Sequence, residues 1–109
     1  MLDLARLVIG KWVTSMHMLF MNQSDFNEDI SRWDTSNVTD MCFMFYGASS
    51  FDQPVEGWNT ANVTNMYRMF KYASSFNQHV EGWNTDNVTD MSYMFYNASS
   101  FTQQPSWLR

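Results

Sequence analysis

The chain has 109 residues and a formal net charge of −5, with 45% hydrophobic and 17% aromatic residues. This apolar content is sufficient for a packed core and argues against disorder. The acidic balance argues against nucleic acid and anionic membranes as partners, because no basic stripe is present to displace counterions from phosphates. No apolar run approaches the roughly 20 residues that a membrane-spanning helix needs, so direct membrane insertion is not expected.

Residues 1–12 are predicted to form an N-terminal cap segment. Their apolar residues are spaced like one face of a short helix: Leu4, Leu7, Val8 and Trp12. The segment lacks the apolar stretch and the small-residue cleavage site of a signal peptide. On its own, this stretch therefore gives no support for secretion.

A 25-residue repeat organises the rest of the chain. The three clear copies read WDTSNVTDMCFMFYGASSFDQPVEG, WNTANVTNMYRMFKYASSFNQHVEG and WNTDNVTDMSYMFYNASSFTQ. We assign residues 13–32 to a degenerate repeat, 33–57 and 58–82 to full repeats, and 83–109 to a last repeat with a ragged C-terminal end. A period of this length predicts a single solenoid domain over residues 1–109, in which each coil buries its apolar side against its neighbours.

Each coil is predicted to contain one short helix. In the full repeat of residues 33–57 the apolar residues recur with helical spacing, at Val38, Met41, Met44, Phe45 and Ala48. Asn37 and Asp40 are interpreted as an N-terminal capping arrangement, with Ser36 and Thr35 as competing cap candidates. The helix is expected to end near Ser49 and Ser50. A short extended segment then returns the chain to the next helix. The predicted fold class is thus an α/β repeat solenoid of about four coils with low strand content.

Stacking such coils predicts rows of equivalent side chains in the interior. The expected rows are Phe26, Phe51, Phe76 and Phe101; Trp33, Trp58 and Trp83; and a hydrogen-bonded polar row of Thr35, Thr60 and Thr85. At the C-terminal end Leu108 occupies the position of the next tryptophan, and Trp107 comes one residue early.

The segments WDTSNVTDM, MFYGASSF and FNQ recur at this period over roughly residues 13–104. They resemble the repeat of BspA-type leucine-rich-repeat surface proteins, also called the mycoplasma lipoprotein repeat. The resemblance implies a leucine-rich-repeat-like solenoid at a cell surface or secreted, active in adhesion or protein recognition, with no catalytic motif. The degenerate repeat of residues 13–32 departs from the pattern by lacking the tryptophan and the Asn-Val-Thr entry, and no lipoprotein-type signal is present. A cytoplasmic location is the alternative.

No residue pattern predicts catalysis, a cofactor or a metal site. His17 and His79 lie at unrelated repeat positions and outside metal-ligand spacings, and no phosphate-binding loop occurs. The chain is therefore predicted not to be an enzyme. Glu56 and Glu81 in the return segments are interpreted as a solvated acidic edge rather than a calcium site.

The single cysteine, Cys42, shares its repeat position with Tyr67 and Ser92. A position that accepts three such different residues is interpreted as the surface of a helix. We therefore predict that the thiol is unreactive.

The positions that differ between copies are the best candidates for binding a partner. They lie off the apolar stripe and carry residue types enriched in interfaces. The candidates are Phe43, Tyr46, Tyr67, Arg68, Lys71, Tyr72, Tyr93 and Tyr96. The structural alternative is that these aromatic rings only pack against adjacent helices, and the rival binding surface is the return-segment face with Glu56, His79 and Glu81.

The predicted function is a non-enzymatic repeat scaffold for protein recognition or cell-surface adhesion, with a protein or cell-surface ligand as partner. The alternative is a purely structural fragment of a longer surface repeat array, with no ligand of its own. Exposed end coils could also stack end to end and form a dimer.

Overall fold

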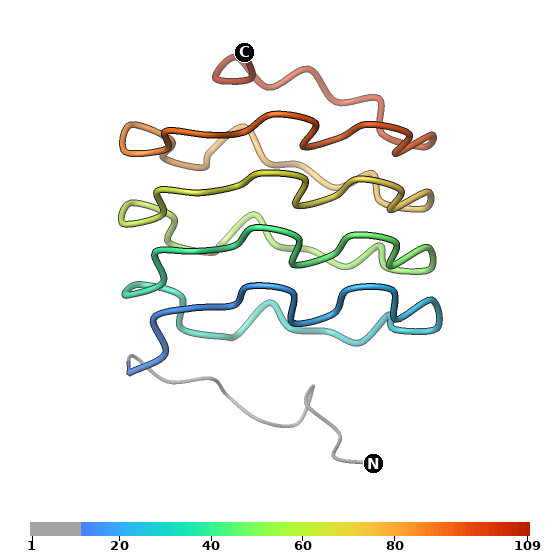
Figure 1. Cartoon of the computed structure of the whole chain (residues 1–109), viewed down its shortest axis with the longest axis horizontal. Helices are drawn as coiled ribbons and strands as arrows, with labels where there is room; N and C mark the ends of the chain where they lie inside the picture. The colour runs from blue at the N-terminus through green and yellow to red at the C-terminus, as the bar shows by residue number, and fades with distance from the viewer. Residues whose placement is uncertain (1–11) are drawn as a thin grey trace.

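The structure, a computed structural model, describes residues 12–109, so the predicted cap segment lies outside the described residues except for Trp12. The described chain winds through successive coils that lie one above another, from the N-terminal end to the C-terminal end (Figure 1). Isolated parallel bridges join the same repeat position in adjacent coils: Ser15 to Asp40, Asp40 to Asn65, and Asn65 to Asp90. Residues one repeat apart are therefore neighbours in space.

The predicted α/β class is wrong, and with it the leucine-rich-repeat-like solenoid of helix-plus-strand coils. Residues 12–109 contain no helix and no strand longer than an isolated bridge. Where a helix was expected in the second coil, Phe43 has φ of 60° and Gly47 has φ of 71°. A right-handed helix requires negative φ at every residue, so these two positions interrupt it. The other coils repeat the interruption, at Met18, Asn22, Arg68, Tyr72, Tyr93 and Asn97.

Backbone hydrogen bonds show what replaces the helix. The N–H groups of Met41, Phe43, Phe45 and Gly47 donate to carbonyls of the following coil, at 2.8–3.0 Å. Between them, the N–H groups of Met44, Tyr46 and Ala48 donate three residues back within their own coil. The chain thus alternates tight turns with a ladder between coils, and both kinds of bond satisfy the buried backbone. Asp40 caps no helix: its Oδ1 accepts the N–H of Cys42 at 2.9 Å, closing a local turn.

The buried positions nevertheless agree with the apolar pattern. The stripe residues Val38, Met41, Met44, Phe45 and Ala48 are all fully buried. A succession of four-residue turns returns the chain to the interior every three or four residues, which is also the spacing of a helical stripe. The pattern therefore marks the core correctly, although it does not distinguish a helix from consecutive turns.

Aromatic rows fill the interior of the stack. Phe26, Phe51, Phe76 and Phe101 form the expected row, with ring centroids 5.6–6.0 Å apart. Phe45 and Phe70 stack in a second row at 5.2 Å. Such stacked rings contribute about 0.5–1.5 kcal/mol per pair beyond the area that they bury.

The tryptophan row continues to the C-terminal end in an unexpected way. Trp58 and Trp83 stack at 6.3 Å, and Trp107, not Leu108, stacks on Trp83 at 6.3 Å. The N–H of Leu108 still bonds the carbonyl of Pro105, as the N–H of Trp83 bonds that of Val80. Leu108 therefore holds the backbone position of the row, while the side chain of Trp107 fills its interior place.

Polar side chains connect the coils outside this core. The buried Thr35 and Thr60 hydroxyls donate to the carbonyls of Asn59 and Asn84 at 2.9 and 3.0 Å, as the expected polar row requires. The return segments are held by side chains: the N–H of Asp52 donates to Asn27 Oδ1, and the N–H of Asn77 donates to Asp52 Oδ1. Each coil is thus bonded to the next all around its circumference.

Candidate functional site

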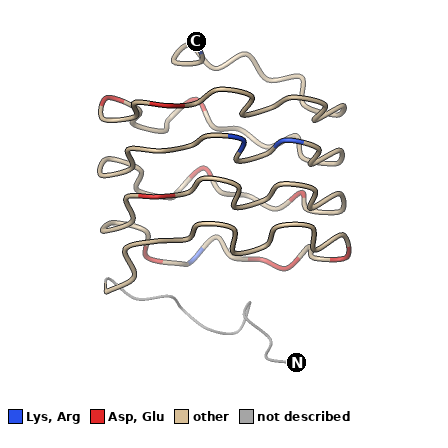
Figure 2. Cartoon of the chain, in the orientation of Figure 1, with Lys and Arg blue, Asp and Glu red and all other residues tan. Residues whose placement is uncertain are grey.

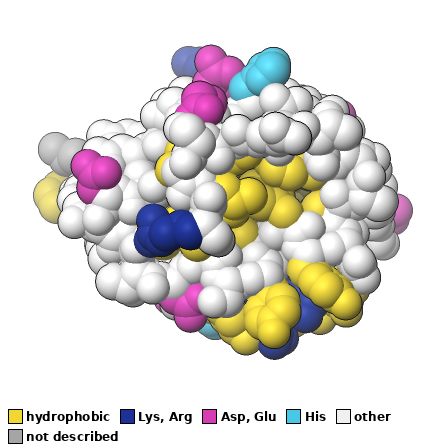
Figure 3. Space-filling view, turned by 90° about the horizontal axis from the view of Figure 1, so that it is seen from above, with side chains coloured by type: hydrophobic (Ala, Val, Ile, Leu, Met, Phe, Trp, Pro, Cys, Tyr) yellow, Lys and Arg dark blue, Asp and Glu magenta, His cyan; other side chains and the backbone are white. Residues whose placement is uncertain are grey.

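The eight residues predicted to bind a partner meet on one side of the stack. We call this surface the tyrosine–cation face, and it comprises Phe43, Tyr46, Tyr67, Arg68, Lys71, Tyr72, Tyr93 and Tyr96. Figure 2 shows its two basic residues on the near side of the third described coil. Seen from above in Figure 3, hydrophobic side chains gather beside Lys and Arg at the lower edge. The eight residues, chosen because their positions differ between copies, therefore lie close together in the structure.

The left-handed turns place much of this face. Phe43, Arg68 and Tyr93 share one repeat position and have φ of 60°, 54° and 57°. Tyr72 occupies the other left-handed position, with φ of 63°, where the preceding coil has Gly47. A bulky residue rarely adopts this conformation, which costs about 1–2 kcal/mol. The strain recurs in every coil, so it belongs to the coil geometry and projects these side chains along one side.

Arg68 lies among aromatic rings rather than beside an acid. Its guanidinium carbon is 4.8 Å from the ring centroid of Tyr67, 5.3 Å from that of Tyr93 and 5.8 Å from that of Phe43. Its Nε is buried and makes no hydrogen bond. Cation–π contacts of this kind contribute about 0.5–2 kcal/mol each, depending on how dry the site is.

Lys71 has a similar environment one turn further along. Its Nζ lies 5.0–5.2 Å from the ring centroids of Tyr72, Tyr93 and Tyr96, and only 9% of the residue is exposed. Within residues 12–109, neither Lys71 nor Arg68 forms an ion pair with a carboxylate. Both cations are therefore held against ring faces, with Arg68 partly exposed and Lys71 almost fully buried.

The rings of the face also contact one another across coils, as the structural alternative requires. Tyr46 meets Tyr72 edge to face at 5.4 Å, and Tyr72 meets Tyr96 at 6.0 Å. These contacts do not bury the outermost rings, because Tyr93 is 56% and Tyr96 49% exposed. The face is thus ordered by packing between coils and still open to solvent.

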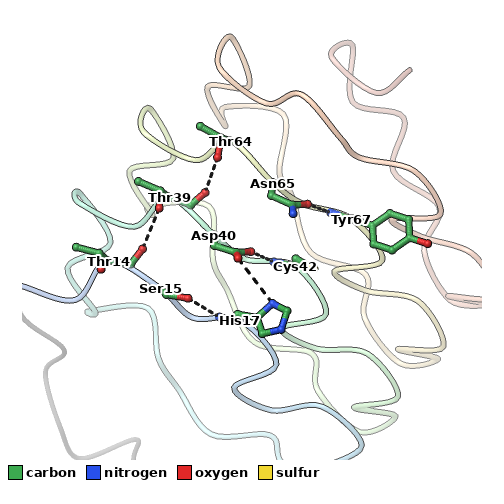
Figure 4. A network of polar contacts seen from close by, with 9 residues as sticks. All are labelled: Thr14, Ser15, His17, Thr39, Asp40, Cys42, Thr64, Asn65 and Tyr67. Atoms are coloured by element: carbon green, nitrogen blue, oxygen red, sulfur yellow. Dashed lines mark hydrogen bonds and ion pairs between the residues drawn. The ribbon is translucent and has the colours of Figure 1, made fainter.

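A second cluster, which sequence reasoning missed, lies on the lower coils. His17 Nδ1 is 3.7 Å from Asp40 Oδ2, and the ligand atoms of His17, Asp40 and Cys42 all lie within 4.8 Å of one another (Figure 4). His17 and Cys42 are one 25-residue period apart, so the repeat alone could have predicted that they are neighbours. The prediction that Cys42 lies on the surface of a helix is wrong, because only 6% of the residue is exposed. Burial raises the pKa of its thiol, and the charges of Asp40 and Asp90 raise it further.

The rival return-segment face offers little. His79 and Glu81 border a hollow of about 130 Å³ together with Val80 and Pro105. Ser106 donates its hydroxyl and its N–H to the Glu81 carboxylate, and these hydrogen bonds lower the pKa of Glu81. The Glu81 carboxylate thus accepts hydrogen bonds within the chain itself. Among the described residues, the return-segment acids form no group of three metal-ligating side chains.

The stacked copies define the class of the molecule as a tandem-repeat protein. Residues 8–107 match the model of the family described as Mycoplasma protein of unknown function, DUF285, and the chain belongs to that family. No curated protein and no solved structure matches the chain. None of the described residues belongs to a helix with the length and apolar character needed to span a bilayer.

Proposed function

We propose that the chain is a non-enzymatic repeat scaffold that recognises a protein or cell-surface ligand through the tyrosine–cation face. The observation that carries this proposal is the pair of cations, Arg68 and Lys71, set among tyrosine rings without a carboxylate partner. Tyr and Arg are the residue types most enriched at interface hot spots. Because packing already holds these side chains, less side-chain entropy is lost when a partner binds.

The charge of the face indicates the chemistry of the ligand. The chain as a whole is acidic, whereas this face contains two basic residues, a partly exposed Arg68 and an almost buried Lys71, and no acid among its eight members. A ligand with exposed carboxylates beside an apolar or aromatic group would pair with both features. We therefore propose an acidic protein segment as the partner, and no cofactor.

A surface location is proposed on the resemblance to BspA-type surface proteins and on membership of a mycoplasma repeat family. The second candidate function is a purely structural segment with no ligand. It is favoured by the edge-to-face contacts of Tyr46, Tyr72 and Tyr96, which give these rings a role in joining coils. Mutation of Arg68 and Lys71 distinguishes the two candidate functions, because a purely structural segment has no ligand binding that the mutation could weaken.

The test is selection of binders from a random peptide library on the immobilised protein. We expect enriched peptides rich in Asp and Glu, which lose at least about tenfold in affinity on the Arg68→Gln, Lys71→Gln variant. The matched control is Arg32→Gln with Arg109→Gln, which makes the same change in net charge away from the face. Failure to enrich peptides, or equal loss in both variants, would favour the structural role.

A further inference from the structure

We infer that His17, Asp40 and Cys42 form a binding site for a borderline transition-metal ion such as Zn²⁺. The three side chains bring an imidazole nitrogen, a carboxylate oxygen and a sulfur within 4.8 Å of one another. A tetrahedral Zn²⁺ with bonds of about 2.0–2.3 Å holds neighbouring ligand atoms roughly 3.3–3.6 Å apart. The separation of 3.7 Å between His17 Nδ1 and Asp40 Oδ2 is already close to that value.

The stacking of two coils creates this cluster. His17 lies one 25-residue period before Cys42, so the two occupy the same position in adjacent coils. Backbone hydrogen bonds fix this register on both sides of His17: Met16 N–H donates to the Asp40 carbonyl at 2.9 Å, and Met18 N–H donates to the Cys42 carbonyl at 3.1 Å. The donor groups are therefore brought together by the fold and not by flexible side chains alone.

Local hydrogen bonds also orient the carboxylate. Asp40 Oδ1 accepts the backbone N–H of Cys42 at 2.9 Å, which leaves Oδ2 directed toward His17 (Figure 4). The His17 ring also meets the edge of Phe43, at 6.3 Å between centroids. Hydrogen-bonded partners such as the Cys42 N–H orient metal ligands, and their removal typically lowers metal affinity by about 10–100-fold.

The chemistry of the ligands selects the class of ion. Calcium and magnesium require six or more oxygen ligands, of which this cluster supplies one side chain. Thiolate, imidazole and carboxylate together suit Zn²⁺, with water as the fourth ligand. Binding forms the bond between zinc and sulfur, and the proton of the Cys42 thiol leaves to solvent.

The cluster occurs once among the described coils. The row of His17 and Cys42 continues with Tyr67 and Ser92, and the row of Asp40 continues with Asn65 and Asp90. None of the later pairs of coils supplies three ligands. An ion at this point would link the degenerate first coil to the second, where the repeat pattern is weakest.

The same rows provide substitutions that the fold accepts. Cys42→Ser installs the residue that the chain has at position 92, and Asp40→Asn installs the one at position 65. Asn65 makes the same local turn, with Oδ1 accepting the N–H of Tyr67 at 2.9 Å. Both variants are therefore expected to keep the fold, which circular dichroism checks. His79→Gln and Asp86→Asn are the matched controls.

The experiment is titration of the purified chain with Co²⁺ as an optical probe, followed by competition with Zn²⁺. We expect one ion per chain and a thiolate-to-cobalt charge-transfer band, which Cys42→Ser abolishes. The affinity for Zn²⁺ should fall more than about 100-fold in Cys42→Ser and in Asp40→Asn, beyond the loss caused by removing an outer partner. The controls should bind as the unmodified chain does.

Two results would overturn the site. One is binding of Co²⁺ without a thiolate band, because the ion would then lie elsewhere. The other is an affinity for Zn²⁺ that is too weak to saturate at one ion per chain, or that is equal in the variants and the unmodified chain.

Discussion

The indole N–H of Trp83 donates to the carbonyl of Val55 at 3.0 Å, from one coil to the coil before it. Trp58 makes the equivalent bond to Ile30 at 3.1 Å. Each tryptophan thus joins two coils twice, through ring stacking and through a buried hydrogen bond.

Trp83→Phe should destabilise the fold by about 2–3 kcal/mol, because it leaves the Val55 carbonyl without this donor and reduces packing. Urea denaturation measures the change. The control is Trp12→Phe, at a residue that is 85% exposed, where less than about 0.5 kcal/mol is expected. Equal losses in the two variants would contradict the structural role of the buried indole.

Gly47→Ala should also destabilise, by about 1–2 kcal/mol, since φ at this residue is 71° and the added methyl group would collide with Asn22 Oδ1. Gly82→Ala is the matched control, because a methyl group there meets no atom within 4 Å. It should be neutral or stabilise by up to about 1 kcal/mol through the unfolded chain. Thermal unfolding of the two variants distinguishes these outcomes, and equal stabilities of Gly47→Ala and Gly82→Ala would contradict the strain expected at positive φ.

Arg68→Met should separate binding from stability. The variant loses contacts with three rings, but it also removes a buried Nε that has no hydrogen-bond partner. These effects oppose each other, so the free energy of unfolding should change by less than about 1 kcal/mol. Acidic peptides selected on the unmodified protein should nevertheless lose affinity, as isothermal titration would show. A large loss of stability would mean that the guanidinium serves mainly to hold the coils together.

Ser106→Ala should raise the pKa of Glu81 toward its ordinary value, because the hydroxyl hydrogen bond is the main cause of its lowered pKa. A lowered pKa in the folded state stabilises the protein above the pKa of the unfolded state, and this contribution is lost as the pH falls through the folded pKa. The variant should therefore show a smaller loss of stability on acidification. Carboxyl NMR titration checks the shift, with Asp29, whose pKa is lowered by Ser31, as an internal reference that should not move.

Sequence reasoning identified the period, the buried positions and the aromatic rows because these depend on which residues recur. It did not identify the backbone conformation. The residues in left-handed turns include Phe43, Arg68 and Tyr93, which carry no sequence signal for positive φ, unlike glycine or asparagine. Consecutive four-residue turns and a helix bury the same apolar stripe, so the apolar spacing alone favoured the helix, which is the commoner element.

The two candidate sites also differ in how far the sequence indicated them. The residues of the tyrosine–cation face were chosen because their positions vary where the rest of the coil repeats, and the structure brings them together. The cluster of His17 and Cys42 was missed because the two residues were assessed separately, although their separation of one period places them side by side. In a stacked chain, residues must be compared down each row as well as along the sequence.

The placement of Trp107 has a practical consequence. The indole N–H of Trp107 donates to the carbonyl of Val80 at 2.9 Å, although Trp107 comes one residue before the position that the 25-residue repeat predicts. The space next to the Trp83 ring therefore accepts an indole from either backbone position. Trp58, Trp83 and Trp107 each lie at a different boundary between two adjacent coils. Versions of the chain that keep one of these three and replace the other four tryptophans, Trp12 and Trp33 included, would report by fluorescence on one boundary at a time. Their unfolding would show whether the stack opens from one end or all at once.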